Sequence, residues 1–145
     1  MDGYCCWLWN GEGVDADRDT PICYLECMKF KDERTECDGR NPDVMRPLVT
    51  KHKRIFRERL TVVKDFLVLH AHWPEVIVAC WCNGGKHRST AMSIYLSRLL
   101  DTQPVHLSLH KHKYRAHRCD RCNGRGTAAE IDDLMELAWA IWRSV

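Results

Sequence analysis

The stretch VIVACWCNGGKHRST at residues 76–90 decides the fold of this 145-residue chain. Val76 to Trp81 is a short, continuous apolar run with β-branched residues, preceded closely by a proline, which is typical of a buried parallel strand. Two glycines follow, and from Ser89 to Leu100 the apolar residues recur at helical spacing. The sequence therefore predicts a strand, a glycine-rich turn and a helix in direct succession.

Regular patterns on both sides extend this unit to an α/β fold. Residues 49–70 carry an apolar stripe of helical period, and a capping box predicts a final helix over 127–145. Residues 104–109 alternate and predict a further strand, which the usual right-handed crossover pairs in parallel with the first. Residues 22–30 form a weaker candidate strand. We predict a short parallel or mixed sheet flanked by helices, with the functional site at the carboxyl edge of its strands.

Composition excludes several classes of protein. Apolar residues are 45% and charged residues 29%, as in a soluble globular chain, and no apolar run is long enough to span a membrane. We predict one domain over residues 1–145. The net charge of +2 does not by itself indicate nucleic acid as a partner. Nine cysteines are an odd number in a chain without a signal-peptide pattern, which predicts reduced thiols in the cytoplasm.

Lysine and arginine residues lie on the other faces of the helix predicted over 49–70. The simplest interpretation is a solvated helix face, and it applies to Lys51, Lys53, Arg54, Arg57 and Arg59.

The segment from Cys82 to Ser89 predicts a phosphate site. Its glycines allow backbone N–H groups to converge, and the first turn of the following helix adds free donors and a partial positive charge. Loops of this kind bind anions. The alternative is a tight turn with incidental basic residues. The candidate ligand-binding residues are Asn83, Gly84, Gly85, Lys86, His87, Arg88 and Ser89.

The same segment has the spacing Cys-x5-Arg-Ser, which is that of cysteine-dependent phosphatases. In that chemistry Cys82 would be the nucleophile, held as a thiolate by the helix N-terminus and the neighbouring cations. Arg88 would stabilise the transition state, and Ser89 would help the thiolate to leave. Asp38 is the candidate general acid. A binding module and a phosphatase therefore both remain open.

The loop Cys-Asn-Gly-Gly-Lys-His-Arg-Ser at the end of an apolar strand resembles that of the RapZ C-terminal domain family. Three weaker pieces agree with this family in the same order. They are the turn Asp38-Gly39-Arg40-Asn41-Pro42, the helix entry Met45-Arg46-Pro47-Leu48 and the strand with a basic exit at 105–113. The resemblance covers about residues 20–114.

This resemblance implies an α/β domain that binds phosphorylated small molecules. In bacterial members the metabolite is an amino-sugar phosphate, and the domain also binds a small regulatory RNA. Carried over by residue, the phosphate cradle falls on Cys82 to Ser89, with Asp38 and Arg40 on the opposite wall. The family domain is not known for phosphatase chemistry, so the resemblance favours the binding module.

The segment 115–126 has a different character and suggests a metal. Its Cys-x2-Cys-x-Gly-x-Gly pattern is similar to one half-site of the DnaJ-type zinc-binding repeat. Two thiolates at this spacing bind one metal, whereas a structural zinc needs four ligands. A reduced pair and a redox pair are the alternatives. The candidate zinc ligands are Cys119, Cys122, His117 and His112, with His110 and the N-terminal cysteines as further choices.

Basic residues also gather in this region. Residues 110–126 carry six lysines and arginines against one aspartate, a local charge of +5, and Tyr114 offers one ring for stacking. A basic loop beside a phosphate cradle suits RNA, and a zinc-stabilised RNA-binding protein is the third hypothesis. The alternative is a solvated loop.

Overall fold

The structure is a computed structural model, and it describes residues 19–31, 38–83, 87–106 and 128–145, together with the backbone of 4–9. Within these ranges four strands form one mixed sheet in the order β2-β3-β1-β4. The strands are β1 (Tyr4–Trp9), β2 (Ile22–Glu26), β3 (Ile77–Trp81) and β4 (Gln103–His106).

The pairing of the strands corrects one prediction. β2 runs parallel to β3, with Ile22 opposite Ile77 and Glu26 opposite Trp81. β1 lies between β3 and β4 and is antiparallel to both. The predicted direct pairing of the 104–109 strand with the 76–81 strand is therefore wrong, although the two strands do run in the same direction. The physical reason is that the apolar N-terminal strand takes the hydrogen-bonding edge between them.

Four helices are described: α1 (Pro42–Val49), α2 (Lys53–Leu69), α3 (Arg88–Leu99) and α5 (Ala128–Arg143). The helix predicted over 49–70 corresponds to α2, but it begins at Lys53, and a separate helix precedes it. α1 starts well because Pro42 occupies its first turn and the Asn41 side chain accepts a 2.8 Å hydrogen bond from the backbone N–H of Asp43. None of these helices is long and apolar enough to cross a membrane.

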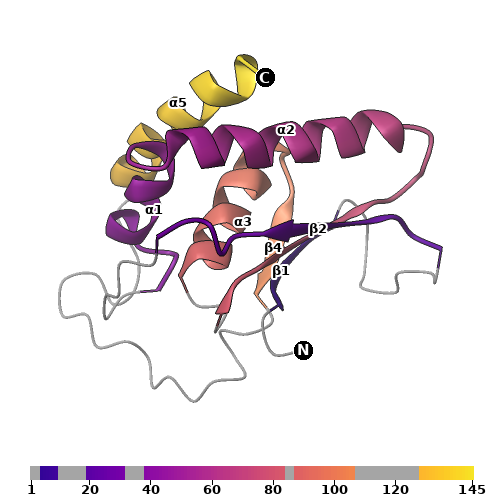
Figure 1. Cartoon of the computed structure of the whole chain (residues 1–145), viewed down its shortest axis with the longest axis horizontal. Coiled ribbons are helices and arrows are strands. Elements are labelled where there is room, and N and C mark those ends of the chain that lie inside the picture. The colour runs from indigo at the N-terminus through magenta and orange to yellow at the C-terminus, as the bar shows by residue number, and fades with distance from the viewer. Residues whose placement is uncertain (1–3, 10–18, 32–37, 84–86, 107–127) are drawn as a thin grey trace.

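The helices pack on the sheet through one apolar core. In Figure 1 α2 runs horizontally above the strands, α5 rises above the left end of α2, and α3 lies beneath α2 beside the strands. Leu25 and Cys80 face this core from the sheet, and Phe56 and Leu60 face it from α2. The buried Tyr95 hydroxyl on α3 donates a 2.9 Å hydrogen bond to the Met45 carbonyl of α1, which links two helices across the core.

Small polar residues allow α3 to sit at the centre of this arrangement. Thr90, Ser93 and Ser97 are all buried, although the helix is not strongly amphipathic. The Ser93 and Ser97 hydroxyls donate to the carbonyls of Thr90 and Ile94, each at 2.8 Å, so their polarity is satisfied inside the helix. These small side chains allow α3 to be buried on nearly all sides.

Candidate anion site at the carboxyl edge of β2 and β3

The candidate site forms where the two parallel strands end. The backbone N–H of Cys27 donates to the Trp81 carbonyl at 2.9 Å, which continues the β2–β3 pairing by one residue. Cys82 follows directly, and α3 begins at Arg88. Ligands of open α/β sheets bind at such an edge, as the sequence predicts for this chain.

Cys82 and Ser89 meet at this edge. The Cys82 Sγ and Ser89 Oγ atoms lie 3.0 Å apart, and both side chains are buried. His87 provides no side-chain cap for α3, and Ser89 is directed to the thiol. In this contact either the thiol or the hydroxyl can donate the hydrogen.

Arg88 is a buried cation held by main-chain groups. Its Nη1 donates to the carbonyls of Met28 at 2.9 Å and Phe30 at 3.0 Å, and the residue is 8% exposed. Its Nε is buried without a hydrogen-bond partner, and it forms no ion pair with any other described residue. Nε and Nη2 make up the edge of a guanidinium that binds an oxyanion in a bidentate manner.

The described residues compensate the burial of the Arg88 guanidinium only in part. A buried charge is costly unless it is paired and hydrogen-bonded, and a buried unpaired N–H loses about 1–3 kcal/mol. The two carbonyls compensate only part of the Arg88 guanidinium. An anion beside its Nε would supply both the missing acceptor and the missing charge.

Asp38 and Arg40 form a closed pair next to this cation. Arg40 donates from Nε to both Asp38 oxygens, at 3.0 and 3.1 Å, and from Nη2 to Oδ2 at 2.6 Å. These hydrogen bonds raise the pKa of the Arg40 guanidinium above its ordinary value. Asp38 is fully buried, and both its oxygens are engaged. The pair is electrically neutral, so it does not cancel the charge of Arg88.

Gly39 brings this turn against α3. A Cβ atom at this position would lie 2.2 Å from the His87 carbonyl oxygen and 2.5 Å from the Ala91 nitrogen, distances that no side chain tolerates. Only glycine permits the backbone of the turn to touch the first turn of the helix so closely. The turn that contains Asp38 and Arg40 therefore lies against the first turn of α3 at His87.

Of the remaining loop residues, the structure describes only some. Asn83 is exposed, and its backbone N–H is directed to the Met28 sulfur at 3.1 Å, so this amide is engaged by the protein itself. Gly84, Gly85 and Lys86 lie outside the described residues.

The predicted metal site also falls outside the described residues, because Cys119, Cys122, His117 and His112 all belong to the segment 107–127. The same applies to all the basic residues of 110–126. Within the ranges that the structure describes, no three metal-ligating side chains come together. Cys23, Cys27 and Cys82 carry free, buried thiols, and burial raises the pKa of Cys23 to about 11.

Sequence reasoning missed the groups that hold Arg88. Met28 and Phe30 act through backbone carbonyls, which carry no side-chain signature. Gly39 did offer a signal, because a glycine between two charged residues in a turn often marks a close backbone approach.

No protein-family model, no curated protein and no solved structure matches the chain. The chemistry of the site therefore rests on its own residues.

Proposed function

We propose that the chain binds a phosphorylated small molecule at the junction of β3 and α3. The observation that carries this proposal is the buried Arg88 guanidinium, which is anchored through Nη1 and has no partner at Nε. A phosphate oxygen accepts from this edge with charge-assisted hydrogen bonds. The chain thereby gains the counter-charge that the described residues do not supply.

The helix itself supplies further donors. As a rule, the N-terminus of an α-helix offers backbone N–H donors and carries a partial positive charge. Arg88 belongs to the first turn of α3, so its side chain and the backbone donors act on the same end of the helix. Such a combination favours a doubly charged phosphate over a single carboxylate.

The resemblance of the 82–89 loop to the RapZ C-terminal domain family supports the same ligand class. It makes amino-sugar phosphates the first compounds to test. Contact with RNA through residues 110–126, and zinc at Cys119 and Cys122, stay predictions that accompany this function.

The test is ligand-induced thermal stabilisation of the full chain. Inorganic phosphate, sugar phosphates, nucleotides and a short RNA are compared on wild type, Arg88→Lys and Arg88→Met. Arg98→Met is the matched control, because Arg98 lies on the same helix but is exposed and pairs with Asp132 at 3.1 Å. We expect one phosphorylated class to raise the Tm by several degrees in wild type and in the control.

The rise should shrink in Arg88→Lys, which keeps the charge but loses the bidentate edge, and disappear in Arg88→Met. If Arg88→Met does not fold, the ligand-induced rise in the Tm of Arg88→Lys, compared with that of wild type, tests the proposal. An unchanged rise in the Arg88 variants, or no rise with any phosphorylated ligand, contradicts the proposal.

A second candidate is a phosphatase, and the 3.0 Å contact of Cys82 Sγ with Ser89 Oγ favours it. In that reaction the thiolate attacks phosphorus, the ester P–O bond breaks, and the alcohol leaves with a proton. Water then hydrolyses the phosphocysteine to inorganic phosphate. Against it, Asp38 is fully buried and both its oxygens accept from Arg40, so it is better suited to positioning the turn than to giving a proton.

Phosphate release measured in the same samples separates the two functions. A binding module shows stabilisation without release. Release that disappears in Cys82→Ser would establish the phosphatase instead.

A further inference from the structure

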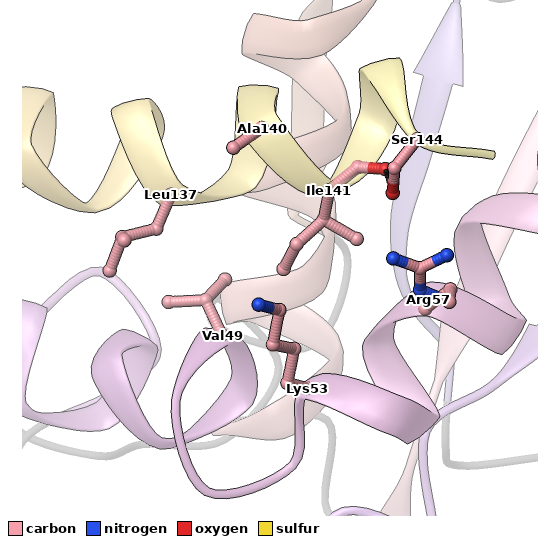
Figure 2. A pocket seen from close by; sticks show the side chains of 7 residues that line it. All are labelled: Val49, Lys53, Arg57, Leu137, Ala140, Ile141 and Ser144. Carbon is pink, nitrogen blue, oxygen red and sulfur yellow. Dashed lines mark hydrogen bonds between the residues drawn. The ribbon is translucent and has the colours of Figure 1, made fainter.

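A pocket of about 270 Å³ lies between the end of α1, the first turns of α2 and the last turns of α5. The apolar part of its lining is formed by Val49, Leu137, Ala140 and Ile141. Val49 and Ile141 are buried, whereas Leu137 is 45% exposed at the rim. The pocket is thus open to solvent, and its lining combines apolar and polar surface in similar parts (Figure 2).

Contacts between α2 and α5 fix one wall of this pocket. Lys64 on α2 donates to the backbone oxygens of Trp142, at 3.0 Å, and of Val145, at 2.8 Å. The same ammonium lies 4.7 Å from the centre of the Trp142 ring. These contacts hold the C-terminal end of α5 on α2, so the pocket is preformed.

Two cations border the opening. Lys53 and Arg57 are one turn apart on α2, and Figure 2 shows the Lys53 side chain extending towards Ile141 and the Arg57 guanidinium near Ser144. Neither cation forms an ion pair with a described residue. The neighbouring Arg54 differs from them, because it lies 3.8 Å from Glu58.

The other polar groups at the pocket do not reduce this positive charge. The first turn of α2 contains no acidic residue, and His52 provides no side-chain cap for it. The Ser144 hydroxyl donates to the Ile141 carbonyl at 2.7 Å, so its proton is already engaged. Lys53 and Arg57 are the charged side chains in the lining of this pocket, and none of its lining residues is acidic.

We propose that this pocket binds an amphipathic carboxylate, a small molecule with one anionic head and a short apolar chain. The chain would cover Val49 and Ile141, and the head would meet the two cations at the rim. Pockets for drug-sized ligands span roughly 300–1,000 Å³, so this one suits a smaller ligand. The apolar side chains in its lining make this pocket distinct in chemistry from the site at Arg88, where backbone carbonyls hold the cation.

The test is calorimetric titration of the full chain with octanoate, beside octan-1-ol and acetate as probes that lack the head or the chain. We expect octanoate to bind more tightly than either. The double variant Lys53→Gln/Arg57→Gln should weaken octanoate binding about tenfold, because it removes both charges that meet the anionic head. Arg54→Gln, the matched control on the same helix, should leave the affinity unchanged.

A third variant tests the apolar part. Ala140→Phe fills the pocket from an exposed position on α5 and should abolish octanoate binding without loss of Tm. The proposal is overturned if octanoate does not bind, if octan-1-ol binds equally well, or if neither the double variant nor Ala140→Phe changes the affinity.

Discussion

The two proposed sites differ in the burial of their cations. At the end of β3, Arg88 is 8% exposed and its guanidinium is anchored by two backbone carbonyls. Beside α5, Lys53 and Arg57 are exposed side chains next to apolar ones. One site therefore has a fixed, desolvated donor, and the other has two mobile, hydrated ones.

This difference indicates what each site recognises. Charge interactions near a protein surface are weak and screened, whereas the same interaction is much stronger when water is excluded. At Arg88 we expect the anionic group itself to be the recognised feature. In the pocket beside α5 we expect the apolar chain to supply most of the affinity and the cations to orient the ligand.

The largest effect should come from Gly39→Ala, which breaks the first site and leaves the second intact. The added Cβ meets the His87 carbonyl oxygen and the Ala91 nitrogen, which are backbone atoms and cannot rotate away. We expect a loss of about 3 kcal/mol in the free energy of unfolding, or a Tm lower by about 10 °C. Chemical denaturation followed by circular dichroism measures this loss.

Glu136→Ala, at an exposed position on α5, serves as the control and should change stability by less than about 0.5 kcal/mol. In the folded Gly39→Ala protein, the phosphate response should fall while octanoate binding persists. A variant as stable as wild type would mean that the turn does not touch α3.

A smaller effect should appear at alkaline pH, on the β2 side of the first site. Burial raises the pKa of Cys23 from 9.0 to about 11, so the folded chain keeps this thiol protonated at a pH where the unfolded chain ionises it. Its contribution to stability is complete below pH 9 and is lost as the pH rises towards 11. Tyr95, whose pKa burial also raises, acts in the same direction at higher pH.

Urea denaturation of wild type and Cys23→Ala at intervals from pH 8 to pH 11 isolates this contribution. The free energy of unfolding should decline less steeply with pH in Cys23→Ala. Parallel curves would show that Cys23 is not desolvated in the folded state.

Local patterns predicted the elements around the first site well. The strand at 76–81, the helix from Ser89 and the final helix all appear, because each has a clear apolar period and a turn before it. β1 was not predicted, although YCCWLW is a continuous apolar run. Its place between β3 and β4 is a pairing across the length of the chain, which no local pattern specifies.

The same holds for the sites: features carried by a local pattern were predicted, and features that depend on distant segments were not. The spacing from Cys82 to Ser89 predicted residues that the structure brings within 3.0 Å. The carbonyl anchors of Arg88 depend on where a distant loop lies, so they could not be predicted. The solvated face predicted for the first half of α2 also changes, because Arg59 pairs with Glu26 at 2.8 Å and two of its neighbours border a pocket.

The smallest predicted effect is a difference between the two sites in how much salt weakens ligand affinity. It tests directly whether burial distinguishes Arg88 from Lys53 and Arg57. The Debye length falls from about 10 Å at 0.1 M salt to about 3 Å at 1 M, which screens exposed charges far more than buried ones. Octanoate affinity, measured by titration at about 0.05 and 0.5 M sodium chloride, should therefore weaken several-fold.

The affinity of the phosphorylated ligand for the Arg88 site should weaken proportionally less over the same range, and octan-1-ol, which has no charge, should not weaken at all. Equal salt sensitivity of the two anions would place Arg88 in water like Lys53. Burial, rather than the type of cation, would then no longer explain why the two sites differ.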